Sequence, residues 1–410
     1  MKYKVTANNR DLKGEIYLPT SKSISNRVLI IKALCDNEIK INNLSISDDT
    51  KILENALKTP ENIIDAGHAG TSMRFLTAYL AQKEGLWTLT GSKRMKERPI
   101  GHLVNGLRQL GAKIEYIENE GFPPLKINGK KLTGDYVKID GSISSQYITA
   151  LLLIVPALQN GLTIELENKI SSIPYIKLTL ELMSYFGIEY IWKDNIIKIL
   201  KGKYLGKEIT IEADWSGASY WYEMAALAEE CDLKVFGLEK NSLQGDSVVS
   251  KIYDQFGITT KYIPNGIYIT KRGNSVKKIE YDFSNFPDLV QTIVVTCVMK
   301  NIPFKISGAE SLKIKETDRI SALQVELVKY GAHIKETGFG QIEWDGTFKR
   351  TNNITQIIYT YNDHRMALAF APIALLKDSV IINDPEVVTK SYPTYWDDLK
   401  KVGFNILELY

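Results

Sequence analysis

Apolar and polar positions follow a pattern that recurs six times along this chain. Each repeat begins with a cluster of Ser, Thr, Gln or Arg, continues as a small and apolar helix, and ends in a short strand. Because stretches such as "ITALLLIVPAL" are apolar on nearly every side, we expect these six helices to be buried. Their marker residues lie 47, 72, 73, 72 and 74 positions apart: Arg27, Arg74, Gln146, Ser219, Gln291 and Arg365. The short first interval indicates that the first unit has lost part of itself.

A second pattern lies between these repeats and has the same period. Five stretches, such as "LVNGLRQLGAKIEY", are typical of an amphipathic helix, a glycine that ends it, and a strand. Their glycines lie 76, 70, 74 and 72 positions apart: Gly111, Gly187, Gly257, Gly331 and Gly403. Two patterns with one period predict six units, each of two helices and several short strands. Six units in 410 residues divide most naturally into two domains of three.

The polar clusters stand where the buried helices are predicted to begin. A helix N-terminus carries free N–H groups and partial positive charge, so it attracts anions. A single Ser or Thr there is explained as an N-cap. Clusters such as Ser144, Ser145 and Gln146 exceed what one cap requires. If several such ends point into one cleft, the sequence predicts an anion-binding site.

Several cations also stand at helix starts, where the helix dipole disfavours positive charge. One interpretation is that they form ion pairs or a solvated face. The other is that they bind an anion with several charges, since Arg suits bidentate carboxylate or phosphate contacts and Lys a point contact. The recurrence favours the second. The cations are Lys22, Arg27, Arg98, Lys315, Arg319, Arg365 and Lys390.

Two acidic residues occur among these cations. Asp288 stands at the head of an apolar helix and could serve only as a favourable cap, while Glu316 could serve only as a partner of Lys315 or Arg319. A site that moves protons needs acceptors held beside its anions. Both residues are therefore candidates for acid–base chemistry.

Composition and motifs exclude several classes. A net charge of +3 is too small for a nucleic-acid binder. The three isolated cysteines and the absence of a long apolar run predict a cytoplasmic protein without membrane spans. Neither a P-loop nor a dinucleotide fingerprint occurs. The four histidines lack metal-ligand spacing, so no metal site is predicted.

Nine motifs, in order along nearly the whole chain, resemble the 5-enolpyruvylshikimate-3-phosphate synthases, an enolpyruvyl transferase family. They are "SKSISNR", "AGTSMRFL", "RMKERPI", "SSQYITALL", "QGD", "FPDLVQT", "KIKETDRI", "YNDHRMA" and "TKSYPTY". The resemblance implies an α/β fold, an inside-out α/β barrel of two domains, each with three βαβαββ units. It implies one lobe of residues 20–212 and a second that combines 1–19 with 213–410, with the active site in the cleft between them.

The resemblance also implies a reaction. Such enzymes transfer the enolpyruvyl group of phosphoenolpyruvate to the 5-hydroxyl of shikimate 3-phosphate and release phosphate, in the biosynthesis of chorismate and aromatic amino acids. The residues that match the shikimate 3-phosphate site are Lys22, Ser23, Arg27, Ser144, Ser145, Gln146, Ser172, Tyr175, Asp288 and Lys315. Those that match the phosphoenolpyruvate site are Lys22, Gly70, Arg98, Gln146, Arg319, Arg365 and Lys390.

The chemistry assigns acid–base roles to Lys22 and Asp288 of these residues and to Glu316. Addition of the hydroxyl requires a base, for which Asp288 is the candidate, and protonation of the methylene requires an acid, for which Lys22 and Glu316 are candidates. No metal or organic cofactor is implied, and we expect a monomer. The family is the target of glyphosate, which binds at the phosphoenolpyruvate site, and Gly70 is expected to govern sensitivity to it.

The chain departs from the family pattern at three positions: His68 stands for the usual Asn, Phe75 for Pro, and Ser311 for Asn. Two alternatives remain. The sister family that acts on UDP-N-acetylglucosamine has a loop cysteine, which "RMKERPIGH" lacks. A non-catalytic relative would have lost acids or cations, yet Lys22, Asp288 and Glu316 are all present.

Overall fold

The computed structural model describes residues 1–273, 276–350 and 355–409. The chain forms two compact lobes and passes between them twice. One, which we call the continuous lobe, is Ser21–Ile211. The other, the discontinuous lobe, combines Met1–Thr20 with Glu212–Tyr410. Each lobe has a hydrophobic core of its own.

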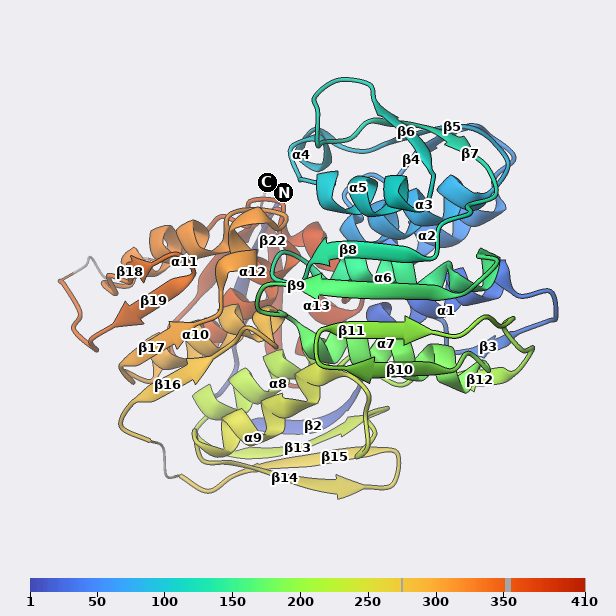
Figure 1. The fold of residues 1–410 in the computed structure, drawn as a ribbon. Helices are drawn as coiled ribbons and strands as arrows, with labels where there is room; N and C mark the ends of the chain where they lie inside the picture. The colour runs from blue at the N-terminus through green and yellow to red at the C-terminus, as the bar shows by residue number, and fades with distance from the viewer. Residues whose placement is uncertain (274–275, 351–354, 410) are drawn as a thin grey trace. The chain divides into compact units, whose positions relative to one another are not determined.

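The continuous lobe contains helices and strands in close alternation (Figure 1). In chain order they are α1 (Lys22–Leu34), β3 (Lys40–Asn42), α2 (Asp48–Lys58), β4 (Ile63–Asp65), α3 (Gly70–Gln82), β5 (Gly85–Thr90), α4 (Lys93–Lys96), α5 (Gly101–Gln109), β6 (Lys113–Tyr116), β7 (Leu125–Gly129), β8 (Tyr136–Asp140), α6 (Ser145–Leu153), the 3-10 helix η1 (Val155–Ala157), β9 (Leu162–Glu167), α7 (Ile173–Tyr185), β10 (Tyr190–Lys193), β11 (Ile196–Ile199) and β12 (Glu208–Thr210).

The discontinuous lobe repeats this alternation and includes both chain ends. Its elements are β1 (Lys2–Ala7), β2 (Leu12–Tyr17), α8 (Trp215–Leu227), β13 (Cys231–Phe236), η2 (Gly245–Val248), α9 (Val249–Asp254), β14 (Ile258–Ile263), β15 (Gly266–Lys271), β16 (Ile279–Asp282), η3 (Pro287–Leu289), α10 (Val290–Met299), β17 (Phe304–Ser307), η4 (Glu310–Ile314), α11 (Arg319–Val328), β18 (Lys335–Gly338), β19 (Gln341–Trp344), β20 (Gln356–Ile358), α12 (His364–Phe370), η5 (Ala371–Leu375), β21 (Val380–Asn383), η6 (Pro385–Lys390), α13 (Tyr395–Lys401) and β22 (Phe404–Leu409).

Five four-stranded sheets share one topology in the part of the chain that the structure describes. In each, two neighbouring strands run parallel, with a buried helix before the second, and two antiparallel strands follow on one side. These two strands form a hairpin in four of the sheets, whereas in the fifth they are β1 and β22, which are remote in sequence. The sheets are β4-β5-β7-β6, β8-β9-β11-β10, β2-β13-β15-β14, β16-β17-β19-β18 and β20-β21-β1-β22. A helix must return the chain between parallel strands, which makes each sheet one βαβαββ unit. The predicted fold class is confirmed.

The sixth sheet is shorter, as the first marker interval predicts. It consists of the parallel pair β12-β3 and has no hairpin. Its first strand, β12, comes at the end of the continuous lobe, although α1 and β3 come at its beginning. The first unit is therefore completed from a distant part of the sequence.

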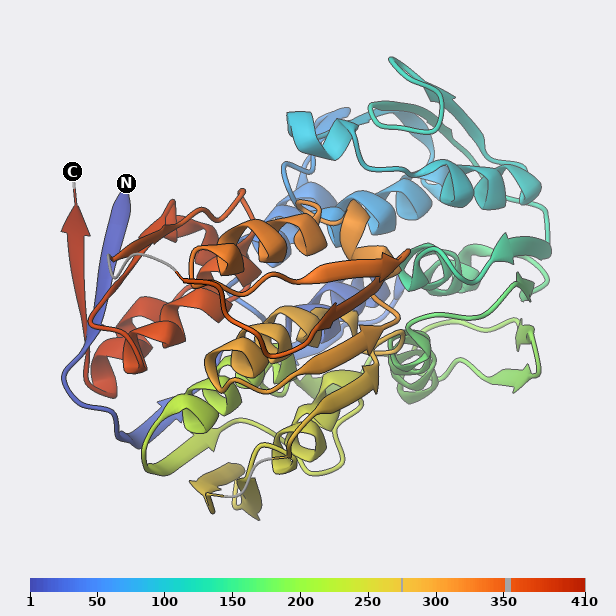
Figure 2. The same ribbon diagram turned by 90° about the vertical axis from the view of Figure 1, so that its left-hand side faces the viewer.

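The N-terminal strands complete two sheets of the discontinuous lobe. β2 runs parallel to β13, and β1 lies between β21 and β22, antiparallel to both. Figure 2 shows the two terminal strands, β1 in blue and β22 in red, side by side. In β13, buried Cys231, Leu233 and Val235 alternate with exposed Asp232 and Lys234, so one face of the strand packs on the core.

The six helices that the sequence predicts to be buried are buried: α1, α3, α6, α8, α10 and α12. In α8, twelve of 13 residues are buried, and in α10 nine of ten. Each of the five periodic glycines follows a helix with a positive φ, from 81° at Gly257 to 96° at Gly403. A glycine adopts this left-handed backbone without steric cost, which explains its place at the helix end.

None of the helices within residues 1–273, 276–350 and 355–409 combines the length and the apolar character that a bilayer crossing requires. The longest helices have 13 residues, whereas a membrane span needs about 20.

Candidate active site

Lys22 begins α1 in the continuous lobe. Ser21 caps this helix by accepting a hydrogen bond from the Ile24 N–H at 3.4 Å. The Lys22 Nζ forms an ion pair with Asp49 Oδ2 at 3.1 Å, and both side chains are mostly buried. Asp49 comes from the first turn of α2, and sequence reasoning missed it. The pair holds the ammonium group of Lys22 at the beginning of α1.

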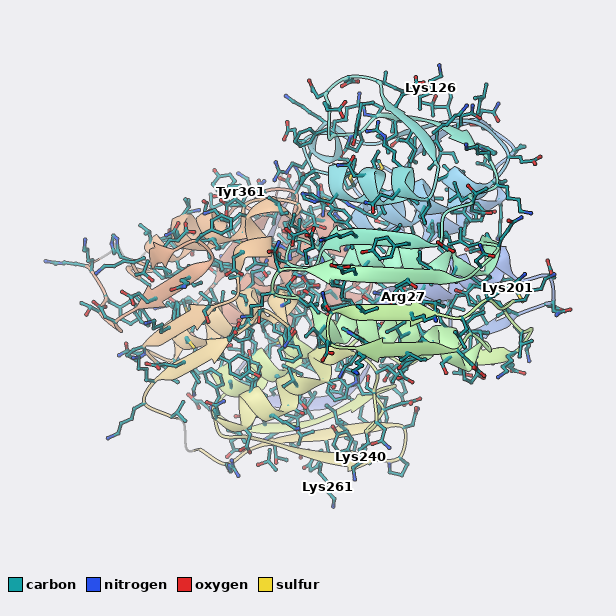
Figure 3. The ribbon with its side chains drawn as sticks, in the orientation of Figure 1. Arg27, Lys126, Lys201, Lys240, Lys261 and Tyr361 are labelled. Carbon is teal, nitrogen blue, oxygen red and sulfur yellow. The ribbon has the colours of Figure 1, made fainter. Side chains whose placement is uncertain are left out.

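Arg27 lies one turn further along α1 and is almost fully buried (labelled in Figure 3). Its Nε donates to Thr179 Oγ1 at 2.8 Å, and its Nη1 donates to the Ser23 carbonyl at 2.8 Å. Its Nη2 donates to Thr149 Oγ1 at 3.4 Å and to the Tyr175 carbonyl at 3.3 Å. These bonds use four of the five N–H donors of the guanidinium group. Arg27 thereby joins α1 to α6 and α7.

The charge of Arg27 is compensated by dipoles. Within the described residues, no carboxylate lies at ion-pair distance, and the guanidinium carbon lies 5.7 Å from the centre of the Phe75 ring. Burial lowers the pKa of Arg27 to about 10, which still leaves it charged at neutral pH. A buried cation of this kind gains stability when an anion binds beside it.

Gly70 is the first residue of α3, and two guanidinium groups lie against it. A Cβ at this position would lie 2.6 Å from Arg98 Nη1 and 3.0 Å from Arg74 Nη1. Arg74 donates from Nη1 to the Gly70 carbonyl at 3.0 Å and from Nη2 to the Pro99 carbonyl at 3.2 Å. The φ of Gly70 lies outside the left-handed region, so space rather than backbone conformation explains the glycine. Arg98 and Arg74 bring two positive charges to the start of α3.

The starts of α6 and α7 carry the other predicted residues of this lobe. Ser144 caps α6 by accepting from the Gln146 N–H at 3.3 Å, and the Gln146 side chain donates to Thr71 Oγ1 at 3.3 Å. Gln146 thus connects α6 to the start of α3. Ser172 precedes α7 with a φ of 54°, a left-handed conformation that is uncommon outside glycine. Such strained residues concentrate at functional sites.

Asp288 lies at the centre of the charged residues of the discontinuous lobe. Its carboxylate contacts Arg365 Nη2 at 2.8 Å, Arg319 Nη1 at 3.2 Å and Lys315 Nζ at 3.8 Å. Burial raises the pKa of Asp288, but the charges of Arg365, Lys315 and Arg319 outweigh burial and hold this pKa well below its usual range. Asp288 is therefore ionised at neutral pH.

Arg319 opens α11 and binds three carboxylates. Its Nε donates to Asp363 Oδ2 at 2.7 Å, its Nη2 to Glu316 Oε2 at 2.9 Å, and its Nη1 to Asp288 Oδ1 at 3.2 Å. Burial lowers the pKa of Arg319, and the three carboxylates outweigh burial and raise it above its usual range. Glu316 also contacts Lys390 Nζ at 3.1 Å. These cations are therefore paired with acids, as the ion-pair interpretation predicts. They are also gathered in one place, as binding of an anion would require.

Arg365 is the second residue of α12 and lies near two further polar groups, Tyr220 and Asp246. Its Nη1 donates to the hydroxyl of Tyr220 at 3.2 Å, and burial raises the pKa of that tyrosine to about 12. Asp246 accepts a hydrogen bond from Ser216 Oγ. Burial and the negative charge of Asp288 raise the pKa of Asp246 to about 6. Two carboxyl groups of one lobe thus have their pKa values shifted in opposite directions.

Comparisons with known proteins show the family to which the chain belongs. The family model described as EPSP synthase (3-phosphoshikimate 1-carboxyvinyltransferase) matches residues 6–59 and 51–399. The chain belongs to the EPSP synthase family. It is 48% identical over 408 residues to a 3-phosphoshikimate 1-carboxyvinyltransferase of Bacteroides fragilis, with 99% of each chain covered. It is 38% identical to that of Colwellia psychrerythraea, with 96% and 97% covered. The predicted family is confirmed.

Solved structures support the fold of this EPSP synthase family member. An EPSP synthase of Acinetobacter baumannii matches with a TM-score of 0.77 and 21% identity, and 99% of this chain and 100% of that chain are covered. The enolpyruvyl transferase NikO of Streptomyces tendae matches with a TM-score of 0.76 and 14% identity, with 99% and 98% covered. At these identities the likeness shows the fold alone.

Two of the three departures from the usual family pattern have defined neighbours. The ring nitrogen Nδ1 of His68 lies 3.0 Å from Ser92 Oγ, at the start of α4. Phe75 is buried and presents its ring to Arg27. Ser311 lies in η4, the 3-10 helix shortly before Lys315. The structure thus connects Phe75 with a predicted site residue.

Sequence reasoning missed several residues that hold the site together. Most of them lie far along the chain from the group they contact. A usable signal existed only where an acid stands inside a recognised motif, as in "QGD" and "YNDHRMA". The missed residues are Asp49, Thr71, Arg74, Thr149, Thr179, Tyr220, Asp246 and Asp363.

The described residues include no group of three or more His, Cys, Asp or Glu side chains that could hold a metal ion. The carboxylates near Asp288 are instead paired with Arg and Lys.

Proposed function

We propose that this protein is a 3-phosphoshikimate 1-carboxyvinyltransferase, which transfers the enolpyruvyl group of phosphoenolpyruvate to the 5-hydroxyl of shikimate 3-phosphate and releases phosphate. Membership of the EPSP synthase family supports the reaction class. The observation that carries the proposal is the Asp288 carboxylate, held between Arg365 at 2.8 Å and Arg319 at 3.2 Å. A proton acceptor fixed among cations suits a reaction between an alcohol and a polyanion.

The two lobes supply different groups, and we propose that one active site uses both. The continuous lobe would supply Lys22, Gly70, Arg98 and Gln146, and the discontinuous lobe Arg319, Arg365 and Lys390. Together they offer five cations to phosphoenolpyruvate, whose carboxylate suits the bidentate Arg side chains and whose phosphate suits the Lys groups as well.

Shikimate 3-phosphate would bind mainly to the continuous lobe in this proposal. Its phosphate would lie at the starts of α6 and α7, with Ser144, Ser145, Gln146, Ser172 and Tyr175, where free N–H groups and hydroxyls serve as donors. Ser23 and Arg27 would bind another part of the same shikimate 3-phosphate molecule. The buried charge of Arg27, with dipoles as its only compensation among the described residues, supports an anion nearby.

The ring hydroxyl would meet Asp288 and Lys315. In the free protein the surrounding cations make Asp288 a weak base, because they hold its pKa well below the usual range. A bound phosphoenolpyruvate would take over part of the charge of Arg319 and Arg365. We therefore expect Asp288 to become a stronger base only when the site is loaded.

The reaction balances as an addition and an elimination. In the addition, the O5–C2 bond forms, Asp288 takes the hydroxyl proton, and the methylene carbon gains a proton from Lys22 or Glu316. In the elimination, the C2–O bond to phosphate breaks, the methyl carbon returns a proton to Lys22 or Glu316, and Asp288 gives up its proton to the released phosphate. The leaving phosphate carries increased negative charge, which Lys22, Arg98 and Lys390 would stabilise.

One assay tests the proposal. Purified protein is supplied with shikimate 3-phosphate, phosphoenolpyruvate, or both, and free phosphate is measured over time. We expect phosphate release only with both substrates. Release from phosphoenolpyruvate alone, or no release with both from a folded protein, would contradict the assignment. UDP-N-acetylglucosamine serves as the control acceptor, and release with it instead would favour the sister family.

We further propose that the active form is a monomer, because each chain carries all the residues assigned to the site. Light scattering during gel filtration should give a mass near 46.3 kDa with and without both substrates. A stable dimer with all the activity would contradict this proposal.

A further inference from the structure

A buried carboxylate at the far end of α11 fastens the chain segment that leads into α12. Glu326 is fully buried. Its Oε1 accepts from the hydroxyl of Tyr361 at 2.7 Å, and its Oε2 accepts from the backbone N–H of Tyr359 at 3.1 Å. Lys329 donates to the same Oε2 at 2.6 Å and to the Ile357 carbonyl at 2.6 Å. The end of α11 therefore holds residues 357–361 by backbone and side-chain bonds together.

Residues 360–363 form a tight turn with a strained backbone at Tyr361. The Asp363 N–H donates to the Thr360 carbonyl at 2.9 Å, and both central residues have positive φ, 54° at Tyr361 and 56° at Asn362. Turns with positive φ at both central positions normally use Gly, Asn or Asp. A tyrosine keeps this conformation only where its surroundings enforce it. The hydrogen bond from the Tyr361 hydroxyl to Glu326 is one such constraint (Tyr361 is labelled in Figure 3).

The last residue of the turn contacts two arginines of the proposed site, Arg319 through its side chain and Arg365 through its backbone. Asp363 is fully buried and accepts from Arg319 Nε at 2.7 Å and from Arg319 Nη2 at 3.3 Å. Its Oδ1 also accepts from the backbone N–H of Arg365 at 3.0 Å, which caps α12. Arg319 and Glu326 are seven residues apart on α11, about 10 Å along the helix. The segment is thus fastened to α11 at two separate places.

We propose that Glu326 and Tyr361 are positioning residues of the anion site. They clamp the strained turn, so that Asp363 holds Arg319 and Arg365 in one mutual geometry. This inference rests on the proposed function, in which both arginines bind phosphoenolpyruvate. In this proposal, Glu326 and Tyr361 act on Arg319 and Arg365 through Asp363.

The test compares two neighbouring tyrosines. Tyr361→Phe removes the hydroxyl that reaches Glu326 and keeps the ring. Tyr359→Phe is the matched control, because Tyr359 uses its backbone N–H for Glu326 and has its ring, not its hydroxyl, near Lys329. For Tyr361→Phe we expect KM for phosphoenolpyruvate to rise about tenfold, the effect of one lost hydrogen bond to a charged group. We expect kcat and KM for shikimate 3-phosphate to change less than about twofold.

Glu326→Gln and the double variant add a second readout. If both residues act through one clamp, Glu326→Gln raises KM for phosphoenolpyruvate, and adding Tyr361→Phe raises it little further. Equal KM values for Tyr361→Phe and Tyr359→Phe would overturn the inference, even if Tyr361→Phe melts at a lower temperature. Fully additive effects would also overturn it. The wild-type assay separates this result from failure of the proposed function, since the comparison requires wild-type turnover with both substrates.

Discussion

Asp288 illustrates how single residues obtain their chemistry from distant partners. Its three cations come from three places in the chain, 27, 31 and 77 positions away, at Lys315, Arg319 and Arg365. Alone, a carboxylate at this position would be a helix cap. Among these charges it becomes an ionised acceptor whose base strength depends on what else the cations bind.

Asp288→Asn should lower turnover by about a hundred- to ten-thousand-fold, because the amide cannot accept the hydroxyl proton. Substrate binding should persist, since Arg319 still pairs with Glu316 and Asp363. The measurement is kcat together with binding of shikimate 3-phosphate by calorimetry. Asp254→Asn, which breaks only an exposed ion pair with Arg272, is the control. Wild-type turnover in a folded Asp288→Asn protein would remove the residue from the mechanism.

Gly70→Ala should raise the ratio of the glyphosate inhibition constant to KM for phosphoenolpyruvate. The new methyl group would lie 2.6 Å from Arg98 Nη1, so the guanidinium must shift, and the longer inhibitor loses more from the reduced space than the substrate does. Both constants are measured in both proteins. Gly217→Ala is the control, because its methyl group in the first turn of α8 would lie 3.7 Å from its nearest neighbours. An unchanged ratio would show that space at Gly70 does not decide inhibitor binding.

The sequence predicts which charges belong to the site better than it predicts what holds them. Charges at helix starts and their recurrence identify Asp288, Arg319 and Arg365. The sequence does not identify Asp363 as a site residue, because it looks like an ordinary helix cap. Its hydrogen bond to Arg319 also spans 44 positions of the chain. The strain at Tyr361 also leaves no signal, since tyrosine carries no preference for positive φ.

At the scale of elements, the periodic pattern predicts the buried helices and the glycines that end the exposed ones. It does not predict which strands complete a sheet, because β1, β2 and β12 join partners that are remote in sequence. Apolar periodicity also hides polar residues inside buried helices. Glu223 lies within α8, is fully buried, and its carboxylate oxygens accept no hydrogen bond within the described residues.

Glu223 should make the stability of the protein fall as pH rises. Burial raises the pKa of Glu223 well above its usual value, so the folded protein keeps it protonated while the unfolded chain ionises above about pH 4.5. Unfolding then becomes easier, by roughly 1 kcal/mol per pH unit, from that pH until the folded pKa is reached. Glu223→Gln removes this contribution.

The measurement is the melting temperature of wild type and Glu223→Gln between pH 5 and pH 8. Relative to the variant, the wild type should lose stability steadily as pH increases. Parallel curves for the two proteins would mean that Glu223 does not change protonation on unfolding. Glu54→Gln, which breaks only the ion pair of this half-buried residue with Lys58, should give curves parallel to the wild type.

At the scale of the whole molecule, two chain passages connect the lobes, at Thr20–Ser21 and Ile211–Glu212. If the proposed site uses both lobes, the charge of the ligands should favour a closed form, because each bound anion satisfies cations of both lobes at once.

Small-angle scattering tests this expectation. Addition of shikimate 3-phosphate should lower the radius of gyration, and phosphoenolpyruvate should not reverse the change. Two variants should be measured in parallel. Lys22→Ala lacks a residue of the proposed site, and Tyr359→Phe is the control outside that site. An identical radius with and without ligand, with binding shown by calorimetry, would instead indicate a rigid site.

The position of β1 between β21 and β22 bears on how the protein is made. During synthesis, residues 21–211 leave the ribosome as one uninterrupted stretch and can fold as soon as they are complete. β1 must wait, because both of its neighbours are translated long after it. Until β21 and β22 have been made, Val5 and the rest of β1 have no partner strand. The lobe that carries Asp288 therefore cannot complete this sheet until two strands that are remote in sequence from β1 have been synthesised.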